Sequence, residues 1–256
     1  MWSREELVAQ NFFEGYLENE SFPLELGRIA LAVEKKLGIK IFLEEVPFPY
    51  EVKAHLRLAR SSALIWLNQN HSKVHQRFSG THEFGHILMK HRNGIPSPGN
   101  SESEKEFESA NNFAAALLMP AKEVACIAKK YPDSLVFLIT KLSKYFGVNI
   151  EEAAKRLSKL DVLPGLFTLL NPSANQLIWE YHSPSVNLDH EAFASFLVYH
   201  FQNPRKREED FDIMGYPFRV ETKRVCGDKV LFTCMPLLSK YDHVVSGGKK
   251  ASGYGK

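Results

Sequence analysis

Two histidines one helical turn apart are the first residues in the chain whose spacing suggests chemistry. His82 and His86 lie in the stretch THEFGHILMKH, and Glu83 follows the first of them. Residues at i and i+4 share one face of an α-helix, so both imidazoles can reach a single cation. The carboxylate of Glu83 can then reach a metal-bound water. This is the HExxH pattern of zinc peptidases, in which two histidines bind metal and the glutamate is the general base.

The alternative is an ordinary helix that carries two incidental histidines. The neighbours argue for the metal interpretation, because Phe78 and Ile87 are apolar and make the helix partly buried. A buried histidine pair without a partner costs free energy. Gly85 is also unusual, since glycine inside a helix costs about 1 kcal/mol relative to alanine. Its presence is explained if another backbone or a substrate comes close at this position.

A catalytic metal site of this kind needs a third ligand. The metzincin pattern would require glycine at position 89 and histidine at position 92, and Met89 and Arg92 exclude it. The next source is a carboxylate from the following helical segment, ESEKEFESANNFAAALLMP. Its acids are Glu102, Glu104, Glu106 and Glu108. The later part of this segment is rich in alanine, which lets it pack closely against the HExxH helix.

The other histidines have simpler explanations. His71 and His75 are also four residues apart, but they lie in a polar stretch without a neighbouring glutamate, so we expect them in solvent. His91 lies near the end of the predicted helix, where the helix dipole favours a cation. No spacing among the remaining histidines demands a metal, although one of them can still line the cleft: His55, His182, His190, His200 and His243.

Hydrophobic periodicity and turn residues predict a mixture of helices and strands. We expect helices over 2–18, 22–38 (with Gly38 as its stop), 72–90, a segment ending at Met119, 121–133 and 189–201. We expect strands over 39–46 and 62–68, and two hairpins, one pairing FTLL with QLIWEYH and the other pairing FRVETKRV with VLFTCMPLL.

Residues 134–160 form a distinct helical pair. Two apolar stripes are separated by Gly147, and Asn149 is placed as the N-cap of the second helix. This is typical of a helix-turn-helix. Basic residues of the pair could face DNA phosphates, namely Lys141, Lys144, Lys155, Arg156 and Lys159. Charges on the outer face of paired helices more often serve solvation, so DNA binding is the weaker interpretation.

The composition bounds the class of protein. The chain has 256 residues, of which 44% are hydrophobic, enough for one sizeable core or two smaller ones. A net charge of +2 gives no reason to expect a nucleic acid or a membrane as partner. Cys126, Cys226 and Cys234 are scattered and odd in number, which favours a reducing compartment over a disulfide framework. We therefore expect a cytoplasmic protein without a membrane segment.

Three stretches together make the chain resemble the ImmA/IrrE-type metallopeptidases of bacteria and phages. They are QRFSGTHEFGHILMKH (76–91), ESANNFAAALLMP (108–120) and LSKYFGVNIEEAAKRLSKL (142–160), in the order and approximate spacing of that family. The resemblance covers roughly residues 20–165. It implies a gluzincin-like catalytic domain. Together with the pattern of helices and strands, we expect an α+β fold with that domain over 1–130, a helix-turn-helix-like unit over 131–165 and a small, sensor-like α+β domain over 166–245. The composition of the tail, residues 246–256, predicts disorder.

The resemblance also implies an activity. One divalent metal, with zinc as first choice and manganese as second, would be held by His82, His86 and a downstream glutamate, and Glu83 would be the catalytic base. The expected function is cleavage of a cognate transcriptional repressor, itself a helix-turn-helix protein. Cleavage would switch on stress-response or mobile-element genes.

The third ligand departs from the family pattern, E-x-x-A-N-x-F-A. With Ala110 fixing the register, the ligand position holds Phe107, and the flanking Glu106 and Glu108 are displaced by about 100° on an ideal helix. Glu108 is our first choice, because one deleted residue before Ala110 would explain the offset, and Glu106 is the second. Alternatively the third ligand is lost. The chain would then be a catalytically weak or inactive relative that acts as a protein-binding regulatory module.

Overall fold

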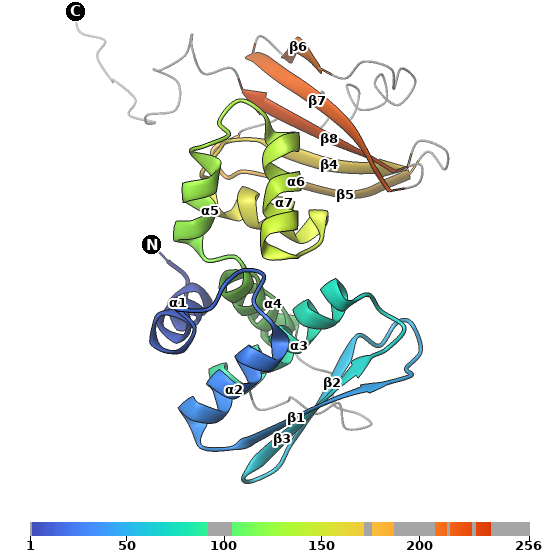
Figure 1. Cartoon of the computed structure of the whole chain (residues 1–256). Helices are drawn as coiled ribbons and strands as arrows, with labels where there is room; N and C mark the ends of the chain where they lie inside the picture. Colours follow the sequence, from blue (N-terminus) through green and yellow to red (C-terminus); the bar gives the residue numbers. More distant parts are fainter. Residues whose placement is uncertain are drawn as a thin grey trace, which may run out of the picture. The chain divides into compact units, whose positions relative to one another are not determined.

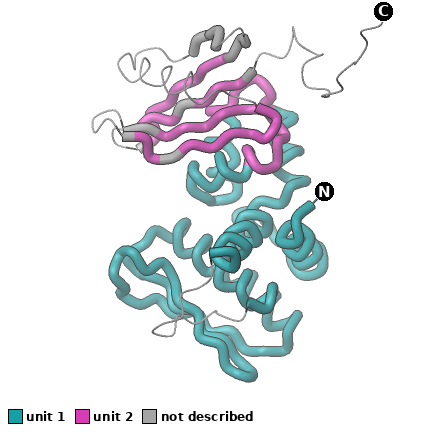
Figure 2. The backbone as a smooth tube through the Cα atoms, turned by 180° about the vertical axis from the view of Figure 1, so that it is seen from behind, with its two compact units in different colours: residues 1–130, 137–156 teal, residues 131–136, 157–256 magenta. Residues whose placement is uncertain are grey.

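The computed structural model describes residues 2–91, 104–171, 176–186, 208–213, 216–226 and 229–236. The chain divides into two compact units, one of residues 1–130 and 137–156, the other of residues 131–136 and 157–256 (Figure 2). Helices and sheets occur together, so the predicted α+β class is confirmed. The boundaries expected at residues 130, 165 and 245 stay predictions.

The first unit combines a small sheet with helices (Figure 1). Its elements are α1 (Arg4–Tyr16), α2 (Leu26–Leu37), β1 (Lys40–Val46), β2 (Ala54–Leu58), β3 (Ser62–Asn68), α3 (Lys73–Met89), α4 (Glu104–Leu118), α5 (Ala121–Ala128) and most of α6 (Leu135–Phe146) and α7 (Ile150–Leu160). The sheet order is β1-β3-β2, with β1 parallel and β2 antiparallel to β3. Among the described strands, β2 therefore pairs on one side only.

Helix ends in this unit follow the local sequence. Gly38 ends α2 with φ of 68°, a left-handed conformation that glycine adopts without strain. Ser72 begins α3, and its hydroxyl accepts a hydrogen bond from the backbone N–H of His75 at 3.3 Å. The predicted helices over 2–18, 22–38 and 72–90 and the strands over 39–46 and 62–68 are confirmed. Strand β2 was not predicted.

Two glycines let α3 pack closely on both sides. A Cβ at Gly80 would lie 2.7 Å from Leu26 Cδ2 of α2, and one at Gly85 would lie 3.2 Å from the Ala110 carbonyl oxygen of α4. The expectation that another backbone approaches Gly85 is thereby confirmed. Close approach fixes α4 against the face of α3 that carries the histidines.

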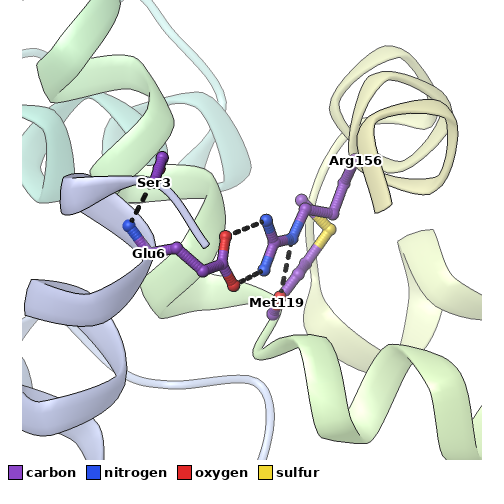
Figure 3. Close-up of polar contacts among 4 residues, drawn as sticks. All are labelled: Ser3, Glu6, Met119 and Arg156. Atoms are coloured by element: carbon purple, nitrogen blue, oxygen red, sulfur yellow. Dashed lines mark hydrogen bonds and ion pairs between the residues drawn. The ribbon is translucent and has the colours of Figure 1, made fainter. Parts of the chain in front are cut away.

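A buried ion pair ties the N-terminal helix to the helical pair within this unit (Figure 3). Arg156 of α7 donates two hydrogen bonds of 2.6 Å to the carboxylate of Glu6 in α1, and its Nε donates to the Met119 carbonyl oxygen at 2.9 Å. The Arg156 side chain is 2% exposed and that of Glu6 is 12% exposed. Arg156 was among the residues considered for DNA phosphates, and its burial excludes that role.

The turn between α6 and α7 is built as the sequence suggested. Gly147 has φ of 58°, and its carbonyl oxygen accepts a hydrogen bond from Arg77 of α3. The backbone N–H of Asn149 donates to Glu152 Oε2 at 3.0 Å, one half of a capping box. The two predicted helices are therefore confirmed, and their turn contacts the helix that carries the histidines.

The second unit contains an antiparallel sheet. Its strands are β4 (Leu166–Asn171), β5 (Gln176–His182), β6 (Glu208–Ile213), β7 (Tyr216–Cys226) and β8 (Lys229–Pro236), in the order β5-β4-β8-β7-β6. Both predicted hairpins are confirmed, as β4–β5 and β7–β8. Strand β6 was not predicted, and the expected helix at 189–201 and the tail at 246–256 lie outside the described residues.

Candidate active site

Helix α3 presents its HExxH residues to a cleft of about 450 Å³ within the first unit. The cleft is lined by residues 51–56, His75, Phe78, Ser79, His82, Glu83, His86, Phe107, Asn111 and Glu152. These residues come from β2 and the segment before it, α3, α4 and the start of α7. The volume lies in the range of pockets that bind small molecules or a few residues of a peptide.

The histidine pair has the geometry that one cation requires. His82 is 7% exposed and His86 is 2% exposed, and their Nε2 atoms are 3.0 Å apart. Two imidazoles bound to one tetrahedral zinc would place their nitrogens about 3.3 Å apart, given Zn–N bonds of about 2.0–2.1 Å. The HExxH residues are therefore brought together as the sequence predicted, although their roles stay predictions.

Hydrogen bonds to the Nδ1 atoms of His82 and His86 indicate how the two rings can be protonated. His82 Nδ1 lies 2.9 Å from Asn111 Oδ1, which can only accept, so Nδ1 carries the proton and Nε2 keeps its lone pair. His86 Nδ1 lies 3.0 Å from His91 Nδ1. If His86 donates there, its Nε2 also presents a lone pair to the cation position. Such partners behind a ligating histidine are the usual way of orienting it.

Both histidines favour the neutral form that metal binding needs. Burial lowers the pKa of His82 from 6.5 to about 4, with Lys53 and His91 acting in the same direction and the Asn111 hydrogen bond opposing them. Burial, followed by the charges of His82 and His91, lowers the pKa of His86 from 6.5 to about 3.

Phe107 occupies the side of α4 that faces the pair. Its ring centroid is 5.0 Å from that of His82, and it lines the cleft together with Asn111, one turn further along α4. Asn111 contacts His82 directly, so Phe107 and Asn111 mark the face of α4 that is turned toward the histidine pair. The register drawn from the family pattern, which put Phe107 at the ligand position, agrees with this arrangement.

The two candidate acids lie elsewhere. Glu108 is exposed, and neither Glu108 nor Glu106 lines the cleft. Glu106 Oε2 is buried. Burial of His91 lowers the pKa of that histidine, and the nearby charge of Glu106 opposes this effect. Among the described residues, no three His, Cys, Asp or Glu side chains are grouped to hold a metal. Two of the three expected ligands thus fit a metal, and the third position does not.

Several cleft residues were not anticipated from the sequence. Lys53 precedes β2, and Glu152 lies in the first turn of α7. Burial and the neighbouring Glu151 raise the pKa of Glu152. Lys53 and Glu152 are distant from the HExxH motif in sequence, so spacing gave no signal for them. His55 lines the cleft, as was left open for the remaining histidines. His75 lines it too and is exposed in the first turn of α3, which agrees with the solvent position that we expected.

His91 has a more specific environment than the helix dipole alone would give. It contacts His86 through Nδ1, and its backbone N–H donates to the His86 carbonyl oxygen at 3.0 Å. Asn111 was missed as a site residue, although its position four residues after Phe107 on the same helix face could have indicated it. His91 and Asn111 therefore join the site as the residues that orient the two histidines.

Residues 34–158 match the IrrE N-terminal-like domain of a peptidase family. No curated protein matches the chain. A solved structure named a Mycobacterium tuberculosis transcriptional regulator is similar, with a TM-score of 0.61 and 17% identity over 98% of this chain and 94% of that one. At this identity the likeness establishes the fold alone. In the described part of the chain no helix has both the length and the apolar character to span a membrane.

Proposed function

The chain belongs, through residues 34–158, to the ImmA/IrrE-type metallopeptidase family, and from this premise we propose that it regulates transcription as a metal-dependent endopeptidase. Its substrate would be a cognate repressor of the helix-turn-helix kind, and its cofactor one divalent metal, zinc in preference to manganese. Cleavage would relieve repression of stress-response or mobile-element genes.

The observation that carries this proposal is the buried histidine pair opening into a cleft beside Glu83. His82 and His86 would hold the metal, with Asn111 and His91 orienting their rings. When bound, such a metal would supply Lewis acidity toward a peptide carbonyl and a water molecule in the cleft. Glu83 lines the same cleft and is only half-buried, so its carboxylate can take a proton from that water and return it to the leaving amine.

The cleft also offers a way to hold an extended peptide. Residues 54–56 of β2 line it, and β2 pairs only with β3 in the described sheet. Such a strand can accept a peptide through backbone hydrogen bonds, independently of most side chains. This favours a protein substrate over a small molecule, and it supports cleavage within an unfolded or extended segment.

A second candidate function, that of a protein-binding regulatory module, is supported by a separate observation. Phe107 stands where the family pattern has a glutamate ligand, and the described residues group no third metal-binding side chain with the pair. Loss of a ligand would weaken metal binding. The chain would then bind the repressor without cutting it, as a regulatory module. The similar solved structure is named a transcriptional regulator, which is compatible with either function.

The two candidates are separated by incubating purified, zinc-loaded protein with a candidate repressor, such as one encoded next to it, and following the products by mass spectrometry. The proposal expects one discrete cut by wild-type protein. It expects at least a hundredfold slower cleavage by Glu83→Gln, because removal of a general base typically costs about 10²–10⁴ in rate. Glu18→Gln, at an exposed glutamate outside the cleft lining, is the matched control and should keep most of the activity.

The outcomes are distinct. Equal cleavage by wild type and Glu83→Gln would contradict the endopeptidase mechanism. A stable complex with the repressor and no cleavage by either protein would establish the regulatory module instead.

A further inference from the structure

A second cavity, of about 470 Å³, lies within the first unit. Its lining comes mainly from α1, from the segment that connects α1 to α2, from residues 120–123 at the start of α5, and from Tyr145 of α6. It shares no lining residue with the cleft that holds the HExxH motif. The proposed function therefore leaves this cavity without a role, although its volume is that of a ligand pocket.

Aromatic side chains form one wall of this cavity. The ring centroids of Phe13 and Phe22 are 5.8 Å apart with an angle of 13° between the ring planes, and those of Phe22 and Tyr145 are 5.6 Å apart. Tyr145 is 43% exposed, and Trp2, which also lines the cavity, is 44% exposed. Large aromatic side chains left this exposed beside a cavity are typical of an interaction surface.

The rest of the wall is negatively charged. Glu14, Glu20 and Glu123 are among its glutamates, and Lys122 is the one basic side chain in the described lining. Lys122 Nζ donates to Glu14 Oε1 at 2.9 Å, so its charge is already compensated. Glu20 lies 3.9 Å from Arg28 in a solvent-exposed pair, which neutralises little of its charge. Glu123 has no ion-pair partner within the described part of the chain.

Aromatic faces next to carboxylates suit an organic cation. The face of an aromatic ring attracts a positive charge, and carboxylates accept hydrogen bonds from it. A guanidinium fits this combination better than an ammonium, because it is planar, stacks on a ring while its edge donates hydrogen bonds, and is more weakly hydrated. The exposed parts of Trp2 and Tyr145 extend the surface beyond one such group. This favours a cation carried on a polypeptide over a free small molecule.

We propose that this cavity binds an arginine side chain in a basic segment of a partner protein. The negative wall would also attract such a segment from solution, although the chain as a whole carries a net charge of +2. The inference requires neither a metal nor cleavage. It therefore goes beyond the proposed function and stands independently of it.

The test is fluorescence polarisation of a fluorescein-labelled Gly-Arg-Gly-Arg-Gly peptide, titrated with the full chain in the presence of EDTA. A peptide with citrulline in place of arginine keeps the shape and loses the charge. A peptide with lysine keeps the charge and loses the planar group. We expect the arginine peptide to bind about tenfold more tightly than the citrulline peptide and about threefold more tightly than the lysine peptide.

Two substitutions assign the binding to this cavity. Tyr145→Leu removes a ring of the wall and should weaken binding by about two- to fivefold, the size of an exposed cation–π contact. Phe137→Leu is its control, because Phe137 is an exposed ring of the same helix outside the cavity lining. Glu123→Gln should weaken binding by about twofold. Glu104→Gln is its control, since both glutamates lie in the first turn of a helix.

The double variant Tyr145→Leu/Glu123→Gln should lose affinity by about tenfold at most, as the two effects add, and both control variants should bind as wild type does. Equal affinities for the arginine and citrulline peptides would overturn the inference, and so would a double variant that binds the arginine peptide as wild type does. Should Tyr145→Leu fail to fold, the comparison of Glu123→Gln with Glu104→Gln decides.

Two further results would overturn the choice of occupant. A lysine peptide bound as tightly as the arginine peptide would contradict recognition of a guanidinium. Acetyl-arginine methylamide that competes with the affinity of the whole peptide would show a site for a small cation instead of a protein segment.

Discussion

The histidine pair shows how much of a site lies in residues outside the motif. His82 and His86 can present Nε2 to a cation only if their Nδ1 atoms are engaged elsewhere, and Asn111 and His91 engage them. The motif spacing predicted which side of the helix carries the ligands. It did not predict these two partners, because one lies 29 residues downstream and the other just beyond the helix end.

Replacement of Asn111 tests this arrangement. Asn111→Leu removes the acceptor for His82 Nδ1–H, so we expect zinc affinity to fall by about 10–100-fold. Isothermal titration measures the change. Asn111→Asp keeps an acceptor and should retain affinity close to that of wild type. Asn112→Leu, next to it and outside the cleft lining, is the matched control. Equal affinities of Asn111→Leu and Asn112→Leu would contradict an orienting role.

At the scale of elements, the packing of α3 determines where chemistry can occur. Gly80 admits α2, Gly85 admits α4, and Arg77 contacts the turn at Gly147. Helices α3, α4, α6 and α7 were predictable because their apolar stripes are long. Strand β2 was not, because Arg57 interrupts a short apolar run that becomes a strand only through pairing with β3. Strand β6, EEDFDI, is mostly acidic and is likewise held by its neighbour β7.

The buried ion pair between Glu6 of α1 and Arg156 of α7 should contribute strongly to the stability of the first unit. Glu6→Ala leaves a guanidinium that is 2% exposed without its carboxylate. We expect the free energy of unfolding to fall by about 3–5 kcal/mol, as for other buried pairs that lose one partner. Urea unfolding followed by circular dichroism measures this.

Two comparisons make that result specific. Glu18→Ala removes an exposed glutamate just beyond α1 and should change the stability by no more than about 0.5 kcal/mol. The double variant Glu6→Leu/Arg156→Met should recover much of the loss, because apolar replacements avoid the desolvation cost of the pair. A Glu6→Ala protein as stable as Glu18→Ala would show that the pair adds nothing.

For the whole molecule, the sequence was most informative about the fold class and the family, and least informative about whether the expected metal site has all of its ligands. The α+β class and the ImmA/IrrE-type family followed from three local motifs, and both are confirmed. The cleft could not be predicted, because Lys53, Glu152 and the HExxH residues meet only in the folded unit. The expected third ligand depended on how the sequence of α4 is aligned with the family pattern, because a shift by one residue replaces Phe107 with Glu106 or Glu108. Neither Glu106 nor Glu108 lines the cleft.

We propose above that His82 and His86 form the metal site of a regulatory metallopeptidase. A crystal structure of zinc-loaded protein, with anomalous scattering at the zinc edge, tests this most directly. We expect one zinc per chain bonded to Nε2 of both histidines, beside Phe107 and with no ligand from α4. Zinc held elsewhere, or a histidine pair without zinc under saturating metal, would contradict it.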